Sequence, residues 1–431
     1  MIVNKFIERF NNPIYKDSVW AIIGNLSLRG LGLLGSIFVA RILGSKIFGE
    51  YGAIKNTIVS IAIFTTFGLG YTATKYIADL ASSRSKQIHQ FITKSIKITF
   101  ILSLTISLFM IILPKIVSED ILKTPHLTNL IRYVSVWVIF NALTTLQIGI
   151  ISGFGEYKNM AKINTVVGLF TFATSVIFTW FYRLEGAIFS LIISQIFNYF
   201  LYYLLLRKIK KKYQFIEDSE TNDISYKSII NFSLPIALQE MVYSLTSWLL
   251  TILIIKFSDF SELGVYTAAI QWSSVVLFIP VVLRNVILSN LSKEKDQKNH
   301  NNVIKKMLML NLVFTLVPIV IIFLFSGTIK NVYGESFSKI NSVLYIALFS
   351  TIFISLNSVY SQAYMSVGKN WIMFIFRLFR DMTIIGLGIY LMVNDKFLGG
   401  AMSMAWATLI ANLLFLVFMA VYYHKKLNRY G

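Results

Sequence analysis

The chain has 431 residues, of which 56% are hydrophobic and only 14% charged, and its formal net charge is +20. Soluble domains carry about 25% charged residues, so most of this surface must face lipid and no separate soluble domain is expected. Cysteine is absent, which excludes disulfides and thiolate metal sites.

The positive charge is distributed as in a membrane protein, not as in a protein that binds nucleic acid. Lys and Arg separate apolar segments of about 20 residues, the length that spans a bilayer. The polar start, residues 1–17, lacks the continuous apolar core of a cleavable signal peptide. The spacing predicts twelve transmembrane helices, at about 18–40, 50–70, 90–113, 127–152, 160–182, 186–206, 229–255, 262–288, 304–326, 340–365, 370–393 and 397–423.

The predicted loops differ in their content of Lys and Arg. Most of the 40 Lys and Arg residues fall in alternate loops, on the side that also holds both chain ends. Cytoplasmic loops carry this excess in membrane proteins, so both termini are predicted to be cytoplasmic.

Short sequence repeats lie half a chain length apart. Residues 48–53 (Phe-Gly-Glu-Tyr-Gly-Ala) are echoed by 263–268 (Leu-Gly-Val-Tyr-Thr-Ala), and 147–153 are echoed by 362–368. A third pair, 184–187 and 398–401, matches one residue out of step. The repeats indicate a duplicated unit, the usual construction of a secondary transporter.

The predicted fold is an all-α integral membrane protein, with twelve transmembrane helices in two six-helix halves around a central cavity. The halves are residues 1–206 and 229–431. Because six is even, both halves enter from the same side and should be related by an axis along the membrane normal. The cytoplasmic linker, 207–228, carries a basic run that we interpret as a determinant of topology.

Enzyme chemistry is not visible in the sequence. There is no phosphate-binding loop of the G-x-x-x-x-G-K-[ST] type and no His-Glu-x-x-His motif. The four histidines lie far apart in the chain, unlike a metal cluster or a nucleophilic triad. No catalytic residue, cofactor or metal is therefore predicted, and energy would come from gradients or from partner proteins.

Several charged residues lie at predicted membrane depth. A charge on a lipid-facing helix centre costs at least about 2.5–3.5 kcal/mol, so such groups normally face the interior or a wet cavity. The cations outnumber the carboxylates, which favours a cavity made for an anion. The set is Arg29, Lys55, Glu240, Arg284, Arg377, Arg380 and Asp381.

Four cations are predicted to bind an anionic substrate: Arg29, Lys55, Arg284 and Arg380. Arg29 could instead bind backbone carbonyls at a kink, Lys55 could reach the outer interface, and Arg284 could be an inner anchor. Arg377 and Asp381 are spaced to pair across one helical turn, which would leave Arg380 as the freer cation.

Glu240 is the predicted ion-coupling residue. It follows Pro235 in a helix that proline can break, and a buried carboxylate there can accept a proton or a cation. The alternative is a structural partner for an arginine. Three aromatic residues on the neighbouring stretches are possible sugar contacts: Tyr243, Trp248 and Trp272.

Residues 40–51, Ala-Arg-Ile-Leu-Gly-Ser-Lys-Ile-Phe-Gly-Glu-Tyr, resemble the A-R-x-L-G-x-x-x-F-G-x-Y segment of Wzx-type polysaccharide-repeat flippases. These belong to the superfamily that also holds the multidrug-and-toxin extruders and the peptidoglycan-precursor flippase. The stretches Phe67–Gly70, Lys75–Ala78 and Gln147–Lys158 fit the same family. The resemblance covers the whole chain.

The resemblance implies a flippase of the bacterial inner membrane. It would move undecaprenyl-pyrophosphate-linked oligosaccharide units to the periplasmic face for O-antigen, capsule or exopolysaccharide synthesis, with a polymerase and a chain-length regulator as partners. A cation-coupled multidrug exporter of the same superfamily is the first alternative. A membrane enzyme acting on the same lipid is the second, although polymerases usually carry a large periplasmic loop that is not predicted here.

Overall fold

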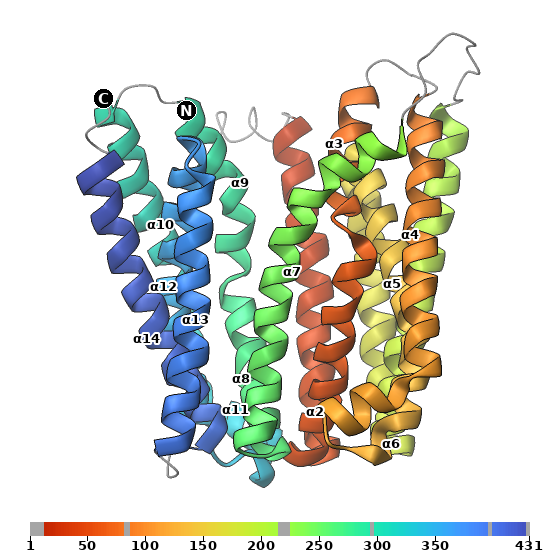
Figure 1. The fold of residues 1–431 in the computed structure, drawn as a ribbon, viewed down its shortest axis with the longest axis vertical. Coiled ribbons are helices and arrows are strands. Elements are labelled where there is room, and N and C mark those ends of the chain that lie inside the picture. The colour runs from red at the N-terminus through yellow and green to blue at the C-terminus, as the bar shows by residue number, and fades with distance from the viewer. Residues whose placement is uncertain (1–12, 82–86, 214–224, 294–296, 395–398, 428–431) are drawn as a thin grey trace. The chain divides into compact units, whose positions relative to one another are not determined.

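The computed structural model describes residues 13–81, 87–213, 225–293, 297–394 and 399–427. In these residues every regular element is helical (Figure 1). The first part contains α2 (Pro13–Thr66), α3 (Leu69–Ala81), α4 (Gln87–Ile112), η1 (Ile116–Ile121), η2 (Pro125–Leu127), α5 (Thr128–Gly153), α6 (Tyr157–Tyr213) and α7 (Tyr226–Phe257). The second part contains α8 (Phe260–Val276), α9 (Phe278–Lys293), α10 (Gln297–Leu324), α11 (Ser326–Tyr333), η3 (Glu335–Phe337), α12 (Ile340–Ser366), α13 (Asn370–Asn394), α14 (Gly399–Tyr422) and η4 (Tyr423–Leu427).

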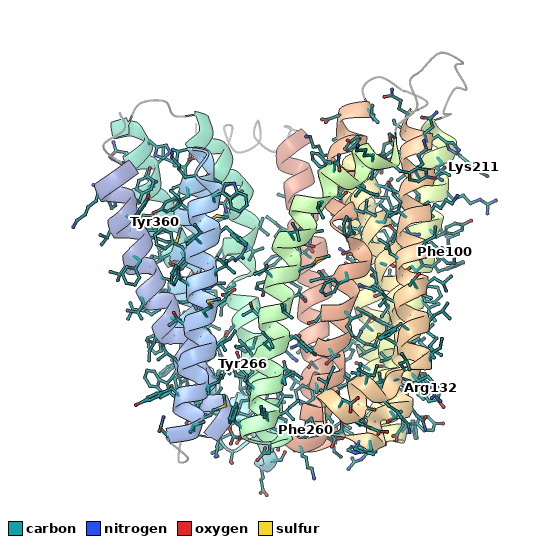
Figure 2. The ribbon with its side chains drawn as sticks, in the orientation of Figure 1. Phe100, Arg132, Lys211, Phe260, Tyr266 and Tyr360 are labelled. Atoms are coloured by element: carbon teal, nitrogen blue, oxygen red, sulfur yellow. The ribbon has the colours of Figure 1, made fainter. Side chains whose placement is uncertain are left out.

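Eight helices of the described residues are long and apolar enough to cross a membrane. Their lipid-facing character shows in Phe100, which is 45% exposed and points away from the helices of its bundle (Figure 2). The protein is therefore a multi-pass membrane protein with an all-helical fold. Apart from Leu113, the described part of each predicted segment lies on helices, with a break inside three of them, at Phe67–Gly68, at Leu277 and at Phe325. The number of crossings and the arrangement of two halves around a cavity stay predictions.

Two long helices each contain a sharp break. In α2 the backbone leaves the helical region at Gly44 (φ 75°, ψ 167°), and in α6 it does so at Arg183 (φ 49°, ψ −125°). Glycine adopts positive φ readily, which explains the first break. At the second, the Arg183 guanidinium donates to the carbonyl oxygen of Ile42 at 2.7 Å. Ile42 lies two residues before Gly44. The Arg183 side chain, at the break in α6, therefore supplies a hydrogen bond to a carbonyl beside the break in α2.

The described chain forms two compact units. Unit 1 contains Met1–Ile42 and Ala53–Trp248, and unit 2 contains Leu43–Gly52 and Leu249–Gly431. Each unit thus includes a segment from the other predicted half. The predicted boundary between the halves, 207–228, lies within unit 1, and part of it is outside the described residues. The division into the halves 1–206 and 229–431 therefore stays a prediction from the sequence repeats.

The order of elements repeats along the chain. A helix that ends in a break is followed by a short helix in both parts: α2 by α3, and α8 by α9. Next come α4, η1, η2 and α5 in one part, and α10, α11, η3 and α12 in the other. The two segments of α6 then correspond to α13 and α14. This correspondence supports the duplication that the sequence repeats predict.

The first repeat motif packs against its own second copy in unit 2. A Cβ added at Gly49 would overlap the carbonyl oxygen of Phe260, and a Cβ added at Gly264 would overlap the carbonyl oxygen of Ser45. The two clashes are one contact viewed from each copy of the motif. Ser45 also shares a hydrogen bond of 2.6 Å with Ser261. Two backbones approach this closely because glycine has no side chain.

Equivalent helices form the core of each unit. In unit 1, buried side chains from α3, α4, α5 and α6 pack together around Phe91 and Tyr202. In unit 2, α9, α10, α12 and α14 pack around Tyr364 and Met419. The two buried tyrosine hydroxyls named here are paired: Tyr202 donates to Asn164 Oδ1 at 2.7 Å, and Tyr364 donates to the carbonyl of Met419 at 2.9 Å.

Candidate functional site

The predicted site residues are divided between the two units. Unit 1 holds Arg29, Lys55, Glu240, Tyr243 and Trp248. Unit 2 holds Trp272, Arg284 and Arg380.

A polar seam joins α7 to α2 in unit 1. The indole N–H of Trp248 donates to Thr57 Oγ1 at 3.1 Å. One turn earlier on α7, the carbonyl of Ser244 accepts from Ser60 Oγ at 3.4 Å. Thr57, Ser60 and Ser244 are buried, and buried polar groups are stable when they are paired in this way.

The seam continues from α7 onto α3. Thr72 and Ser233 share a hydrogen bond of 2.8 Å between their buried hydroxyls. Between the two ends of the seam, the half-buried carboxyl of Glu240 lies within hydrogen-bonding reach of Tyr71. We define the polar seam by these contact residues: Thr57, Ser60, Tyr71, Thr72, Ser233, Glu240, Ser244 and Trp248.

Glu240 is the acidic residue of the seam, and it remains accessible. Tyr71 is 64% exposed and Tyr243, one turn beyond Glu240, is 58% exposed, so a ligand could reach the carboxyl from that side. Among the described residues no Lys or Arg forms an ion pair with Glu240. Helix α7 runs without a break through Pro235, so proline does not interrupt it.

The seam was not predicted, although its signal is in the sequence. Ser233, Glu240, Ser244 and Ser247 follow one another at intervals of seven, four and three residues, which places them on one face of a helix. Ser247 joins the same face, since its carbonyl accepts from Asn56 Nδ2 at 3.2 Å. A polar stripe in an apolar helix indicates contact with another helix or with a ligand.

The two predicted anion ligands of unit 1 both lie on α2. Arg29 lies before the break at Gly44 and is exposed, whereas Lys55 lies after it and is half-buried. Both side chains have interactions within the protein. Their role toward a substrate stays a prediction.

Arg380 does not have the environment that the sequence spacing predicted. Its Nε and one terminal nitrogen both donate to Asp381 Oδ1, at 2.8 and 2.6 Å, and its guanidinium lies 5.6 Å from the centre of the Phe415 ring. Arg380 is thus the partner of the neighbouring Asp381, and its description as the freer cation of the helix was wrong. The Arg380 and Asp381 side chains are only 16% and 6% exposed.

The other two residues of unit 2 are less defined. Trp272 is half-buried on α8 and its indole nitrogen is buried. Arg284 lies on α9, and its side chain is outside the described residues.

A buried carboxylate that sequence reasoning did not single out organises one end of unit 2. Glu262 Oε1 accepts from Lys339 Nζ at 2.8 Å, and Oε2 accepts from the N–H of Ala401, in the first turn of α14, at 3.0 Å. Asp259 caps α8 by accepting from the Glu262 N–H at 2.8 Å. The hydrogen bond to Glu262 raises the pKa of Lys339 above its usual value. Negative charge at a helix N-terminus is stabilising, so we assign Glu262 a structural role.

The described residues contain no group of three or more His, Asp or Glu side chains that could hold a metal ion.

The family described as polysaccharide biosynthesis protein matches residues 14–288. The chain belongs to this family. A relative from Methanocaldococcus jannaschii, the uncharacterized membrane protein MJ1375, is 24% identical over 415 residues, which cover 92% of this chain and 95% of that protein.

Solved structures of similar fold are transporters of the MOP superfamily. An inward-facing multidrug resistance MATE family transporter matches with a TM-score of 0.77 and 16% identity, over 95% of this chain and 100% of that one. An outward-facing MATE family transporter matches with a TM-score of 0.72 and 15% identity, over 97% and 96%. A MOP superfamily transporter from Pyrococcus furiosus, with a binding pocket described as of reverse polarity, matches with a TM-score of 0.70 and 14% identity, over 95% of each chain. These neighbours show the fold.

Proposed function

We propose that this polysaccharide biosynthesis family member is a flippase for undecaprenyl-pyrophosphate-linked oligosaccharide units. It moves them from the cytoplasmic to the periplasmic face of a bacterial inner membrane by alternating access, for O-antigen, capsule or exopolysaccharide synthesis. The observation that carries the proposal is the family match over residues 14–288, on the fold of MOP-superfamily transporters. A polymerase and a chain-length regulator are the proposed partners.

The topology that we propose has twelve crossings with both termini in the cytoplasm. We count α2 and α6 as two crossings each, because each is broken near its middle, and α8 with α9 as one. The repeated order of elements then gives six crossings in each half. Rocking of residues 1–206 against 229–431 would switch access.

The excess of cations at membrane depth supports an anionic substrate. Arg, Lys and a pyrophosphate form charge-assisted hydrogen bonds, and Arg can do so through two nitrogens. Desolvating each sugar hydroxyl without a partner costs several kcal/mol, so a hydrated path for the glycan is needed. The undecaprenyl tail of the substrate can stay in the lipid. The Pyrococcus furiosus relative, with its pocket of reverse polarity, indicates that site charge varies within the superfamily.

The test of this function is complementation. Deleting the gene in its native host should abolish surface polysaccharide and trap completed undecaprenyl-linked units on the cytoplasmic face. Arg29→Ala and Arg284→Ala should fail to restore surface glycan at matched expression. Lys115→Ala should restore it, because that side chain is 75% exposed. Normal glycan with altered drug sensitivity in the deletion strain would indicate the multidrug exporter instead.

We also propose that Glu240 couples transport to an ion gradient. Glu240→Gln keeps the shape of the side chain but cannot exchange a proton at this carboxyl or neutralise a cation. We expect it to lose the gradient-dependent part of translocation, measured in vesicles before and after the gradients are collapsed. Glu185→Gln changes an exposed carboxylate and should behave as wild type. A Glu240→Gln variant whose translocation still falls when the gradients collapse would exclude this role.

A further inference from the structure

Unit 1 contains a cavity, lined in part by cationic and amide side chains, at one end of its helical bundle. The cavity has a volume of about 250 Å³ and is bounded by α4, α5 and α6. Figure 2 shows Lys211, the residue that follows the cavity-lining Lys210, at this end of the bundle and directed away from it. Arg132 lies toward the opposite end. The distribution of Lys and Arg predicts that the cavity end is cytoplasmic.

Two cations line the same cavity. Arg207 and Lys210 both line it, and their spacing of three residues places them on one face of α6. Lys210 is half-buried. Among the described residues no carboxylate forms an ion pair with either side chain. Cations held together in this way favour the binding of an anion.

A buried side-chain amide lines the same cavity. Gln147 on α5 lines it and is only 5% exposed, and its Oε1 has no hydrogen-bond partner in the described part of the chain. A buried acceptor without a donor is destabilising, and a ligand with a hydroxyl group would supply that donor. Tyr199 and Tyr203, whose ring centroids lie 6.2 Å apart, form an amphipathic wall of the kind found at membrane interfaces.

The equivalent place in the repeat is different. In unit 2 a groove of about 580 Å³ lies between α10, α12 and α14, the counterparts of α4, α5 and the second segment of α6. Its lining is aliphatic apart from Lys305 and Tyr360. Of the described residues that line these two sites, a pair of cations and a buried amide are found in the unit 1 cavity and not in the unit 2 groove.

We propose that the unit 1 cavity binds the headgroup of an anionic phospholipid that carries hydroxyl groups, such as phosphatidylglycerol. The phosphate would contact Arg207 and Lys210, and a headgroup hydroxyl would donate to Gln147. Basic pockets between transmembrane helices on the cytoplasmic side bind acidic lipid headgroups. The volume is below the range of roughly 300–1,000 Å³ that holds drug-sized ligands, which favours a headgroup over an oligosaccharide. The proposal requires only insertion in the membrane and is independent of the transported substrate.

Binding of phosphatidylglycerol to the purified full chain in phosphatidylcholine nanodiscs tests the proposal. Each cation near an acidic lipid surface contributes about a factor of five in binding. Arg207→Gln/Lys210→Gln should therefore weaken binding by about 20- to 30-fold. The matched control is Lys208→Gln/Lys211→Gln, which removes the same charge from the same helix but not from the cavity. It should weaken binding clearly less than the cavity variant, since neither Lys208 nor Lys211 lines the cavity.

A second variant tests the headgroup. Gln147→Leu should reduce the preference for phosphatidylglycerol over phosphatidylmethanol, which has the same charge without the hydroxyls, and wild type should show that preference. Equal losses in the two double variants would mean a diffuse attraction and overturn the proposal. It would also be overturned if a polyprenyl-pyrophosphate-linked sugar, and not phosphatidylglycerol, bound in a way that depends on Arg207 and Lys210.

Discussion

Gly49→Ala is expected to destabilise unit 2 by about 3 kcal/mol, the upper part of the usual range for overpacking. The added methyl would overlap the carbonyl oxygen of Phe260 on α8. A flexible side chain could rotate away, but a backbone carbonyl moves only with its helix. Gly264→Ala should have a similar effect, because it makes the same contact from the other copy of the repeat, against Ser45.

Thermal unfolding of the purified variants in one detergent measures the effect. Gly32→Ala is the matched control, since Gly32 lies on the same helix, α2, with no atom within 4 Å of an added Cβ. Alanine is favoured over glycine within a helix by roughly 0.5–1 kcal/mol, so this variant should be at least as stable as wild type. Equal stability of Gly49→Ala and Gly32→Ala would show that the helices are not in contact at Gly49.

The duplication was readable from the sequence, but the contact between its copies was not. The motifs at Phe48–Ala53 and Leu263–Ala268 predicted two equivalent segments, and the repeated order of elements supports that. Their packing against each other depends on the tertiary fold, which local pattern does not encode. Segment 41–49 shows the same limit. It was expected to be a loop between helices, yet it is helical apart from the break at Gly44.

The candidate site shows what a spacing rule leaves out. The rule that residues one turn apart interact predicted that Arg377 pairs with Asp381. The rule did not predict that Arg380 donates to the adjacent Asp381, which is possible because an arginine side chain is long enough to fold back along its helix. The polar seam was missed for a different reason. Serine and threonine are unremarkable singly in a membrane helix, and only their shared face on α7 distinguishes them.

Asp381→Ala should destabilise the protein by about 3–5 kcal/mol, the cost of breaking a buried ion pair from one side. The Arg380 and Asp381 side chains are 16% and 6% exposed, so removing the carboxylate leaves the guanidinium with little access to water. Replacing both partners by apolar residues of similar size removes the uncompensated charge and is often close to neutral. The double variant Arg380→Met/Asp381→Leu should therefore be more stable than Asp381→Ala alone in thermal unfolding.

The same double variant decides between two roles for Arg380. A guanidinium that already donates twice to one carboxylate oxygen, and lies beside the Phe415 ring, is held mainly by its own helix and by α14. If Arg380 nonetheless binds the substrate pyrophosphate, the double variant should fold and reach the membrane but fail to restore surface polysaccharide. If the pair only stabilises α13, the double variant should restore it while Asp381→Ala does not. The Arg380 charge is absent in Arg380→Met/Asp381→Leu, whereas in Asp381→Ala it is present without its Asp381 partner. Comparing these two variants therefore separates an effect on stability from an effect on substrate binding.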